Sequence, residues 1–112
     1  MSEDRLQQEC YLWFHNTYPK LRGLLFHVPN GGNRKGREAR KFKVMGVFPG
    51  VADLLFIYKG RFFALELKVF GGSQSDNQKY WESIVTQNGV NYYLVWSLEE
   101  FKDLINKILS NG

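Results

Sequence analysis

The sequence has little cysteine, little histidine and no long hydrophobic run. Its 112 residues include one cysteine, Cys10, and two histidines. One cysteine excludes an internal disulfide, and so few thiol and imidazole groups argue against a structural zinc site. No apolar stretch reaches the roughly 18–20 residues that span a membrane, and residues 1–5 lack the apolar core of a secretory signal. We therefore expect one cytoplasmic domain, residues 1–112, with no membrane partner and with Cys10 as a small core residue.

The positive charge is concentrated in one segment. Residues 34–43 hold six of the 15 basic residues and one of the 11 acidic ones, so the remaining chain has a slight negative excess. A local basic patch is the expected electrostatic footprint for a phosphate backbone. The same pattern would fit a solvated helix face or an acidic protein partner. The residues predicted to contact DNA are Arg34, Lys35, Arg37, Arg40 and Lys41.

Hydrophobic periodicity and capping residues predict an α/β domain with the order α-β-α-β-β-α-β-α. Strands are expected at 24–28, 51–58, 62–69 and 90–96, and helices at 3–18, 37–45, 76–88 and 98–108. Ser2 can cap the first helix, and Ser75 and Ser97 each begin a capping-box pattern. The late strand–helix–strand crossover indicates a mixed sheet with helices on both faces.

Charged residues interrupt two of the predicted strands. Asp53 lies in the first apolar run of a predicted hairpin, and Glu66 and Lys68 lie in the second. Burying such groups costs several kcal/mol unless they are paired or bind a metal. If Lys59-Gly60 forms a two-residue turn, the register places Asp53 directly opposite Glu66, with Lys68 on the same face. Their Cβ atoms would then be about 4.5–5.5 Å apart.

A divalent cation would remove the repulsion between two such carboxylates, and Mg²⁺ prefers oxygen ligands. The ammonium of Lys68 beside them suits phosphate chemistry, in which charge develops on non-bridging oxygens. Two other interpretations stay open. A three-residue turn would make the two acids only diagonal neighbours. Alternatively, Glu66 and Lys68 could be solvent-facing residues of an edge strand, with Asp53 as a residue at the start of a strand.

These residues resemble a known family. Pro49-Gly50-Val51-Ala52-Asp53, followed after twelve residues by Glu66-Leu67-Lys68, is similar to the PD-(D/E)XK nuclease signature. More narrowly, nearly the whole chain resembles the VRR-NUC domain, the virus-type replication–repair nuclease. Glu9 resembles the N-terminal acidic residue of that family, Asn30-Gly31-Gly32 its glycine-containing loop, and Gln78 its downstream glutamine. The resemblance implies a restriction-endonuclease-like mixed sheet flanked by helices.

The resemblance also implies roles for individual residues. Asp53 and Glu66 would ligate Mg²⁺ or Mn²⁺ together with the main-chain carbonyl of Leu67, and Lys68 would orient or activate the attacking water. Glu9 would hold a water or assist a second ion, and Gln78 would position Lys68 or the phosphate. A boundary glutamate paired with a base would equally explain Glu9, and the capping box alone would explain Gln78.

The function implied is a metal-dependent, structure-selective DNA endonuclease that cuts branched DNA such as four-way junctions as a homodimer. A restriction-type endonuclease, a non-catalytic DNA-binding module and a protein-interaction domain are the alternatives. Among the remaining residues, His27 is expected to be a satisfied histidine at a strand end. Trp13, Trp81 and Trp96 fit the core better than a base-stacking surface.

Overall fold

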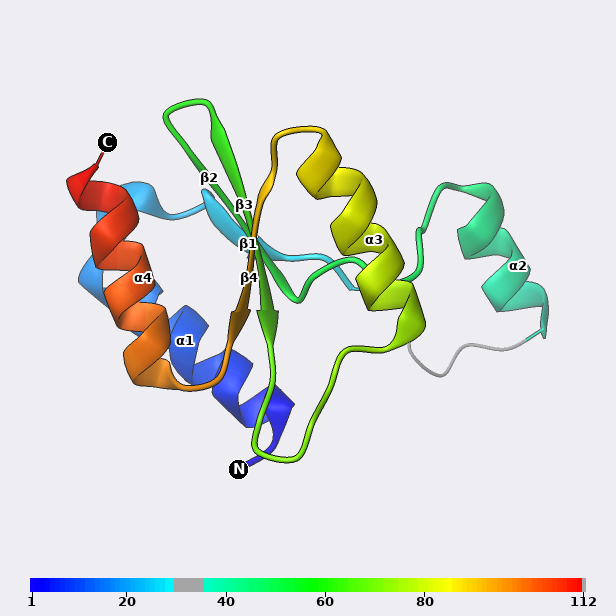
Figure 1. The fold of residues 1–112 in the computed structure, drawn as a ribbon, viewed down its shortest axis with the longest axis horizontal. Coiled ribbons are helices and arrows are strands. Elements are labelled where there is room, and N and C mark those ends of the chain that lie inside the picture. Colours follow the sequence, from blue (N-terminus) through cyan, green and yellow to red (C-terminus); the bar gives the residue numbers. More distant parts are fainter. Residues whose placement is uncertain (30–35, 112) are drawn as a thin grey trace.

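The computed structural model describes residues 1–29 and 36–111, without the side chains of residues 36–39. A four-stranded sheet in the order β1-β2-β3-β4 lies between helices, with α1 and α4 on one face and α3 on the other (Figure 1). Helix α2 lies apart from the sheet, beyond α3 (Figure 1). The mixed α/β fold and the predicted order of elements are confirmed. The elements are α1 Glu3–Thr17, a short 3₁₀ helix Pro19–Leu21, β1 Leu25–His27, α2 Gly36–Val44, β2 Leu54–Tyr58, β3 Arg61–Leu67, α3 Asp76–Gln87, β4 Asn91–Val95 and α4 Leu98–Ser110.

The β2–β3 hairpin has the two-residue turn that the sequence predicts. Lys59 and Gly60 both have positive φ, 50° and 77°, as a type I′ turn requires. Tyr58 pairs with Arg61, and the antiparallel register continues to Leu54 opposite Leu65. One further step along this register brings Asp53 opposite Glu66 at the end of the hairpin.

The β3–β4 pair is parallel and is connected by α3, so the predicted mixed sheet is confirmed. Alternation along β3 sends Phe63, Leu65 and Leu67 into the larger apolar core, which α1 and α4 complete. Cys10 is a fully buried member of that core, and burial raises the pKa of its thiol to about 12. The other face of the sheet carries a smaller apolar cluster, which packs against α3 through Trp81.

The structure confirms the predicted helix caps, with one exception. Ser2 accepts a hydrogen bond from Arg5 N, and the Ser75 capping box is complete. Ser97 accepts from Glu100 N, but the Glu100 carboxylate accepts from Trp96 N, one residue before the cap. The second predicted capping box is therefore wrong in one of its two hydrogen bonds, because the Glu100 carboxylate bonds to Trp96 N and not to Ser97 N. The predicted core position of Trp96 is also wrong, since its side chain lies just beyond β4 and is 41% exposed.

Candidate active site

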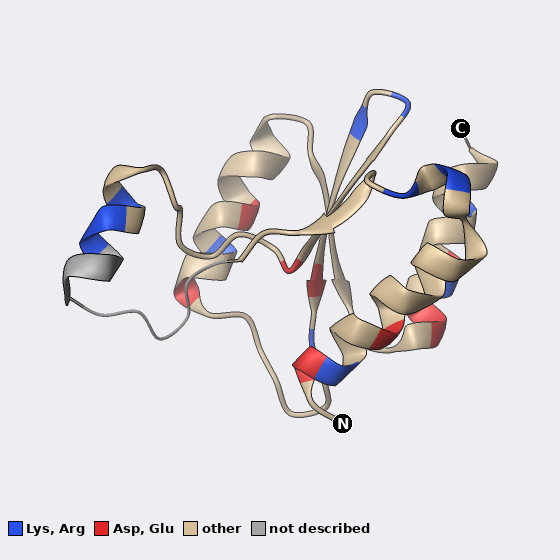
Figure 2. Ribbon diagram, turned by 180° about the vertical axis from the view of Figure 1, so that it is seen from behind, with Lys and Arg blue, Asp and Glu red and all other residues tan. Residues whose placement is uncertain are grey.

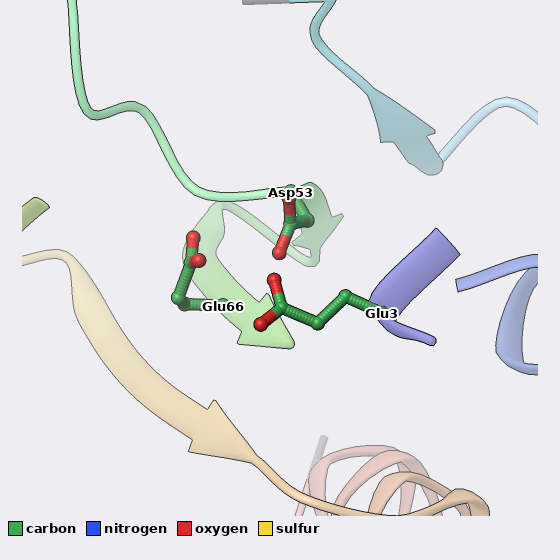
Figure 3. Close-up of side chains that lie close together, drawn as sticks. All are labelled: Glu3, Asp53 and Glu66. Atoms are coloured by element: carbon green, nitrogen blue, oxygen red, sulfur yellow. The ribbon is translucent and has the colours of Figure 1, made fainter. Parts of the chain in front are cut away.

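Three carboxylates from distant parts of the chain converge at one end of the sheet. Glu3 begins α1, Asp53 directly precedes β2, and Glu66 lies near the end of β3. Each offers a carboxylate oxygen, and these oxygens lie within 4.8 Å of one another (Figure 3). Three carboxylates this close repel one another when all are ionised. A proton on one of them, or a bound cation, would relieve this repulsion.

Two contacts hold Asp53 at this position, one through its side chain and one through its main-chain carbonyl. Its carboxylate oxygen Oδ2 accepts a hydrogen bond from Leu67 N over 2.9 Å, across the end of the hairpin. Its main-chain carbonyl lies 2.6 Å from Nδ1 of His27, at the end of β1. The expectation of a satisfied histidine at a strand end is confirmed. The contact to Leu67 involves its N–H, so the role of the Leu67 carbonyl stays a prediction.

Glu66 is buried, with 1% of its surface exposed. Its Oε2 accepts a hydrogen bond of 2.8 Å from Gln78 Nε2 and lies 3.4 Å from Lys68 Nζ. Its Oε1 has no hydrogen-bond partner among the described residues. Burial, and then the charge of Asp53, raise the pKa of Glu66 to about 8 despite the opposing effect of Lys68. A buried, unpartnered carboxylate oxygen beside two other acids suits coordination of a cation.

Gln78 makes contacts that fit both interpretations of it, as a capping residue and as a neighbour of Lys68. Its Oε1 accepts from Ser75 N over 2.8 Å, which completes the capping box of α3. The same oxygen accepts from Lys68 Nζ over 2.9 Å, while Nε2 donates to Glu66. The start of α3 therefore contacts both the ammonium and the carboxylate, and Lys68 is only 5% exposed.

A close backbone contact connects α3 to the segment that carries Asp53. Gly50 has φ +88°, and a Cβ added there would lie 2.9 Å from Gln78 N and closer still to the Asn77 carbonyl. Only glycine allows the chain to pass the start of α3 at this distance. The contact brings the backbone before Asp53 against the helix turn that presents Gln78.

Glu9, the predicted N-terminal acid, does not join the cluster. It forms an ion pair of 3.2 Å with Arg5, one helical turn before it. Glu3 takes the place instead. It lies six residues earlier on α1, about 9 Å along the helix axis, so the two acids cannot reach the same point. The amphipathic pattern places Glu9 near the buried stripe of α1 but does not show which turn of the helix meets the hairpin. The sequence feature that could have pointed to Glu3 as the N-terminal acid is its position in the first turn of α1, next to the Ser2 cap.

The predicted DNA-contacting residues whose backbone the structure describes lie on α2. Arg40 and Lys41 are exposed on this helix, away from the sheet (Figure 2). Arg34 and Lys35 lie outside the described residues, as does the predicted loop Asn30-Gly31-Gly32, and the side chain of Arg37 is likewise not described. Within the described part of the chain, the positive patch is therefore a property of a projecting helix.

Comparisons with known proteins identify the fold. No family model and no curated protein matches the sequence. A solved structure named "VRR_NUC domain protein" superposes with a TM-score of 0.83 at 22% identity, over 100% of this chain and 91% of the other. Another, named "VRR_NUC domain", gives 0.59 at 21% identity, over 93% and 94%. The chain thus has the VRR-NUC fold that the sequence resemblance implied.

No helix in the described part of the chain is both long and apolar enough to cross a membrane.

Proposed function

We propose that this chain is a divalent-metal-dependent DNA endonuclease that hydrolyses phosphodiester bonds. One observation carries the proposal: the buried, unpartnered Oε1 of Glu66 lies in a group of three carboxylates, with Lys68 and Gln78 in contact with the same residue. Solved structures with this fold that are named for the VRR-NUC domain support it. A structural role alone would leave the cost of this burial unexplained.

The residues of the cluster fit a hard divalent cation. Carboxylate oxygens are preferred ligands of Mg²⁺ and Mn²⁺, so Glu3, Asp53 and Glu66 would hold the ion, with the Leu67 carbonyl as a further predicted ligand. Once bound, the ion would polarise the phosphodiester and lower the pKa of a water molecule at the site. In this proposal Glu3, and not Glu9, is the acid that α1 contributes, and it contacts the ion directly.

Lys68 and Gln78 have distinct roles in this proposal. The Lys68 ammonium lies beside Glu66 at the proposed metal site, where it can orient the attacking water and offset charge on the phosphate oxygens. Gln78 is a positioning residue, because its carbonyl oxygen accepts from the ammonium and its amide donates to Glu66. The two contacts fix the amine relative to the acid before DNA arrives.

The substrate we propose is branched DNA, such as a four-way junction, cut by a homodimer with two active sites. Exposed Arg40 and Lys41 on the projecting helix α2 supply positive charge for the backbone. The chain has 112 residues and little surface for reading base sequence, so the shape of the DNA is the feature that it can select. The junction preference and the dimer rest on the family resemblance.

The test is cleavage of a labelled four-way junction in Mg²⁺, in Mn²⁺ and in EDTA, with a linear duplex of the same sequence for comparison. We expect metal-dependent cleavage of the junction by the natural sequence and none by Asp53→Asn. The asparagine retains an oxygen that can accept from Leu67 N, so the hairpin end should stay intact. Asp103→Asn, at an exposed position of α4, is the matched control and should cut normally.

Lys68→Ala separates chemistry from binding. We expect it to abolish cleavage while Mn²⁺ affinity, measured by calorimetry, falls only slightly. Junction binding without cutting by the natural sequence in both metals would refute the nuclease and support a non-catalytic DNA-binding module. Equal cleavage of junction and linear duplex would leave the nuclease standing and refute its structure selectivity.

A further inference from the structure

A cavity of about 470 Å³, within the range of small-ligand sites, opens on the α1 and α4 side of the sheet, at the end of β3 that also carries Glu66. It lies between the start of α1 and the segments that follow β3 and β4. Its lining includes Met1, Glu9, Val69, Phe70, Trp96 and Leu98.

The cavity and the acid cluster share their backbone. Met1 lies two residues before Glu3, and Val69 directly follows Lys68. Just past Phe70, a Cβ at Gly72 would lie 3.3 Å from Glu3 Oε2 and 3.7 Å from Lys68 Cδ. The loop that provides one wall of the cavity therefore also lies against two groups of the proposed active site.

The cavity wall is apolar and aromatic, although it borders a charged site. Phe70 is fully exposed and Trp96 is 41% exposed. Large apolar side chains gathered at an opening indicate a binding surface. The described lining has one acid, Glu9, whose carboxylate already pairs with Arg5. A wall of this kind offers stacking to a flat ring and little to a phosphate.

We propose that the cavity binds an unpaired nucleobase from a nucleotide next to the scissile phosphodiester, stacked against Trp96 and Phe70. This inference rests on the proposed nuclease function and adds a substrate class to it. Every phosphate in DNA adjoins a base, and aromatic side chains stack on any base irrespective of sequence. A base inside a duplex is already stacked and paired, so only a strand with an unpaired nucleotide at the cleavage point can fill the cavity.

The binding test uses forked DNA duplexes that each carry one 2-aminopurine, a fluorescent adenine analogue, at a different unpaired position near the fork. They are mixed with the full chain in EDTA, so that no cleavage occurs. We expect strong quenching at one position with the natural sequence, loss of that quenching in Trp96→Ala, and retention in Trp96→Phe. Phe70→Ala should weaken it too, and this residue is too exposed for its loss to unfold the chain.

Tyr93→Ala is the matched control, because Tyr93 lies on β4 and is 38% exposed but borders a different cavity. It should leave the quenching unchanged. Quenching that persists in both Trp96→Ala and Phe70→Ala would overturn the proposal. So would loss of quenching to the same degree in Tyr93→Ala.

The cleavage test repeats the comparison with an abasic nucleotide at the quenched position. Trp96→Ala should lower kcat/KM by about 5–150-fold on the intact fork, the range for loss of one base stack, and should have no effect on the abasic fork. An equal loss on both forks would overturn the stacking assignment. If the natural sequence cuts no DNA in any metal, the proposed function fails, and the 2-aminopurine signal still decides whether a base enters the cavity.

Discussion

The contact between Gly50 and the start of α3 gives the sharpest test of how the site is built. In Gly50→Ala, the new methyl group would face two penalties. Its backbone would keep a φ near +88°, which costs an L-residue about 1–2 kcal/mol. It would also press against the Asn77 carbonyl and Gln78 N, and overpacking against fixed atoms costs about 1–3 kcal/mol. We therefore expect a loss of about 2–5 kcal/mol in the free energy of unfolding.

Gly89 supplies the matched control at the other end of the same helix. Its φ is +89°, and a Cβ there would meet nothing within 4 Å. Gly89→Ala should consequently cost only the backbone strain of about 1–2 kcal/mol. Both values can be measured by urea unfolding, provided that the slope of the transition is unchanged. The difference between the two losses of stability measures the cost of the steric contact with α3, because both variants carry the same backbone strain.

The activity of Gly50→Ala completes the test. If the segment moves away from α3 to relieve the contact, Asp53 shifts relative to Gln78 and the cleavage rate should fall even where the protein remains folded. Gly89→Ala should cut normally at the same temperature. Equal losses of stability in the two variants, or full activity in a folded Gly50→Ala protein, would refute the reasoning that this contact positions the site.

Three further predictions concern charge. In EDTA, the folded chain keeps a proton on Glu66 between pH 4.5 and about 8 that the unfolded chain releases, so stability should decline by on the order of 2–4 kcal/mol as pH rises through this window. In Glu66→Gln the urea midpoints at pH 5 and pH 8 should lie closer together, and an unchanged gap would contradict this. Glu3→Gln should weaken Mn²⁺ binding, measured by calorimetry, by about tenfold or more, whereas Glu9→Gln should leave it nearly unchanged; the reverse result would restore Glu9 to the site. Replacing Arg40 and Lys41 together by alanine should reduce the slope of log K for junction binding against log salt by about 1.8, and an unchanged slope would move the DNA contact elsewhere.

Local sequence signals predicted much of the site. The Lys59-Gly60 turn sets the hairpin register, and the register alone brings Asp53 opposite Glu66. A two-residue turn fixes the register of both strands, so the pairing of Asp53 with Glu66 could be predicted from the residues of the turn alone. Gln78 was proposed from the family resemblance, and the capping box, which was the alternative explanation, fixes where α3 begins and hence where its third residue points.

The N-terminal acid could not be chosen in the same way. Leu6 and Cys10 bury one face of α1, which shows how the helix is rotated but not how far it extends along the sheet. That position depends on packing between distant elements, so Glu3 and Glu9 were not separable from spacing alone. The predicted burial of Trp96 was wrong for a related reason. Its apolar side chain suggested a core position, but Trp96 follows the end of β4 and lines a cavity, where it is 41% exposed.

The apolar core determines the chemistry of the opposite face of the sheet. Leu65 and Leu67 are buried against α1 and α4, and Glu66 lies between them on the face toward α3. A slip of one residue in β3 would turn Glu66 and Lys68 into that apolar core, away from Gln78, and the two leucines toward α3, which would cost several kcal/mol for each charge. The core therefore excludes the alternative register far more strongly than any contact within the site could. The unfavourable burial of Glu66 persists because this packing holds β3 in place, which keeps the acid at the position where the proposed cation would bind.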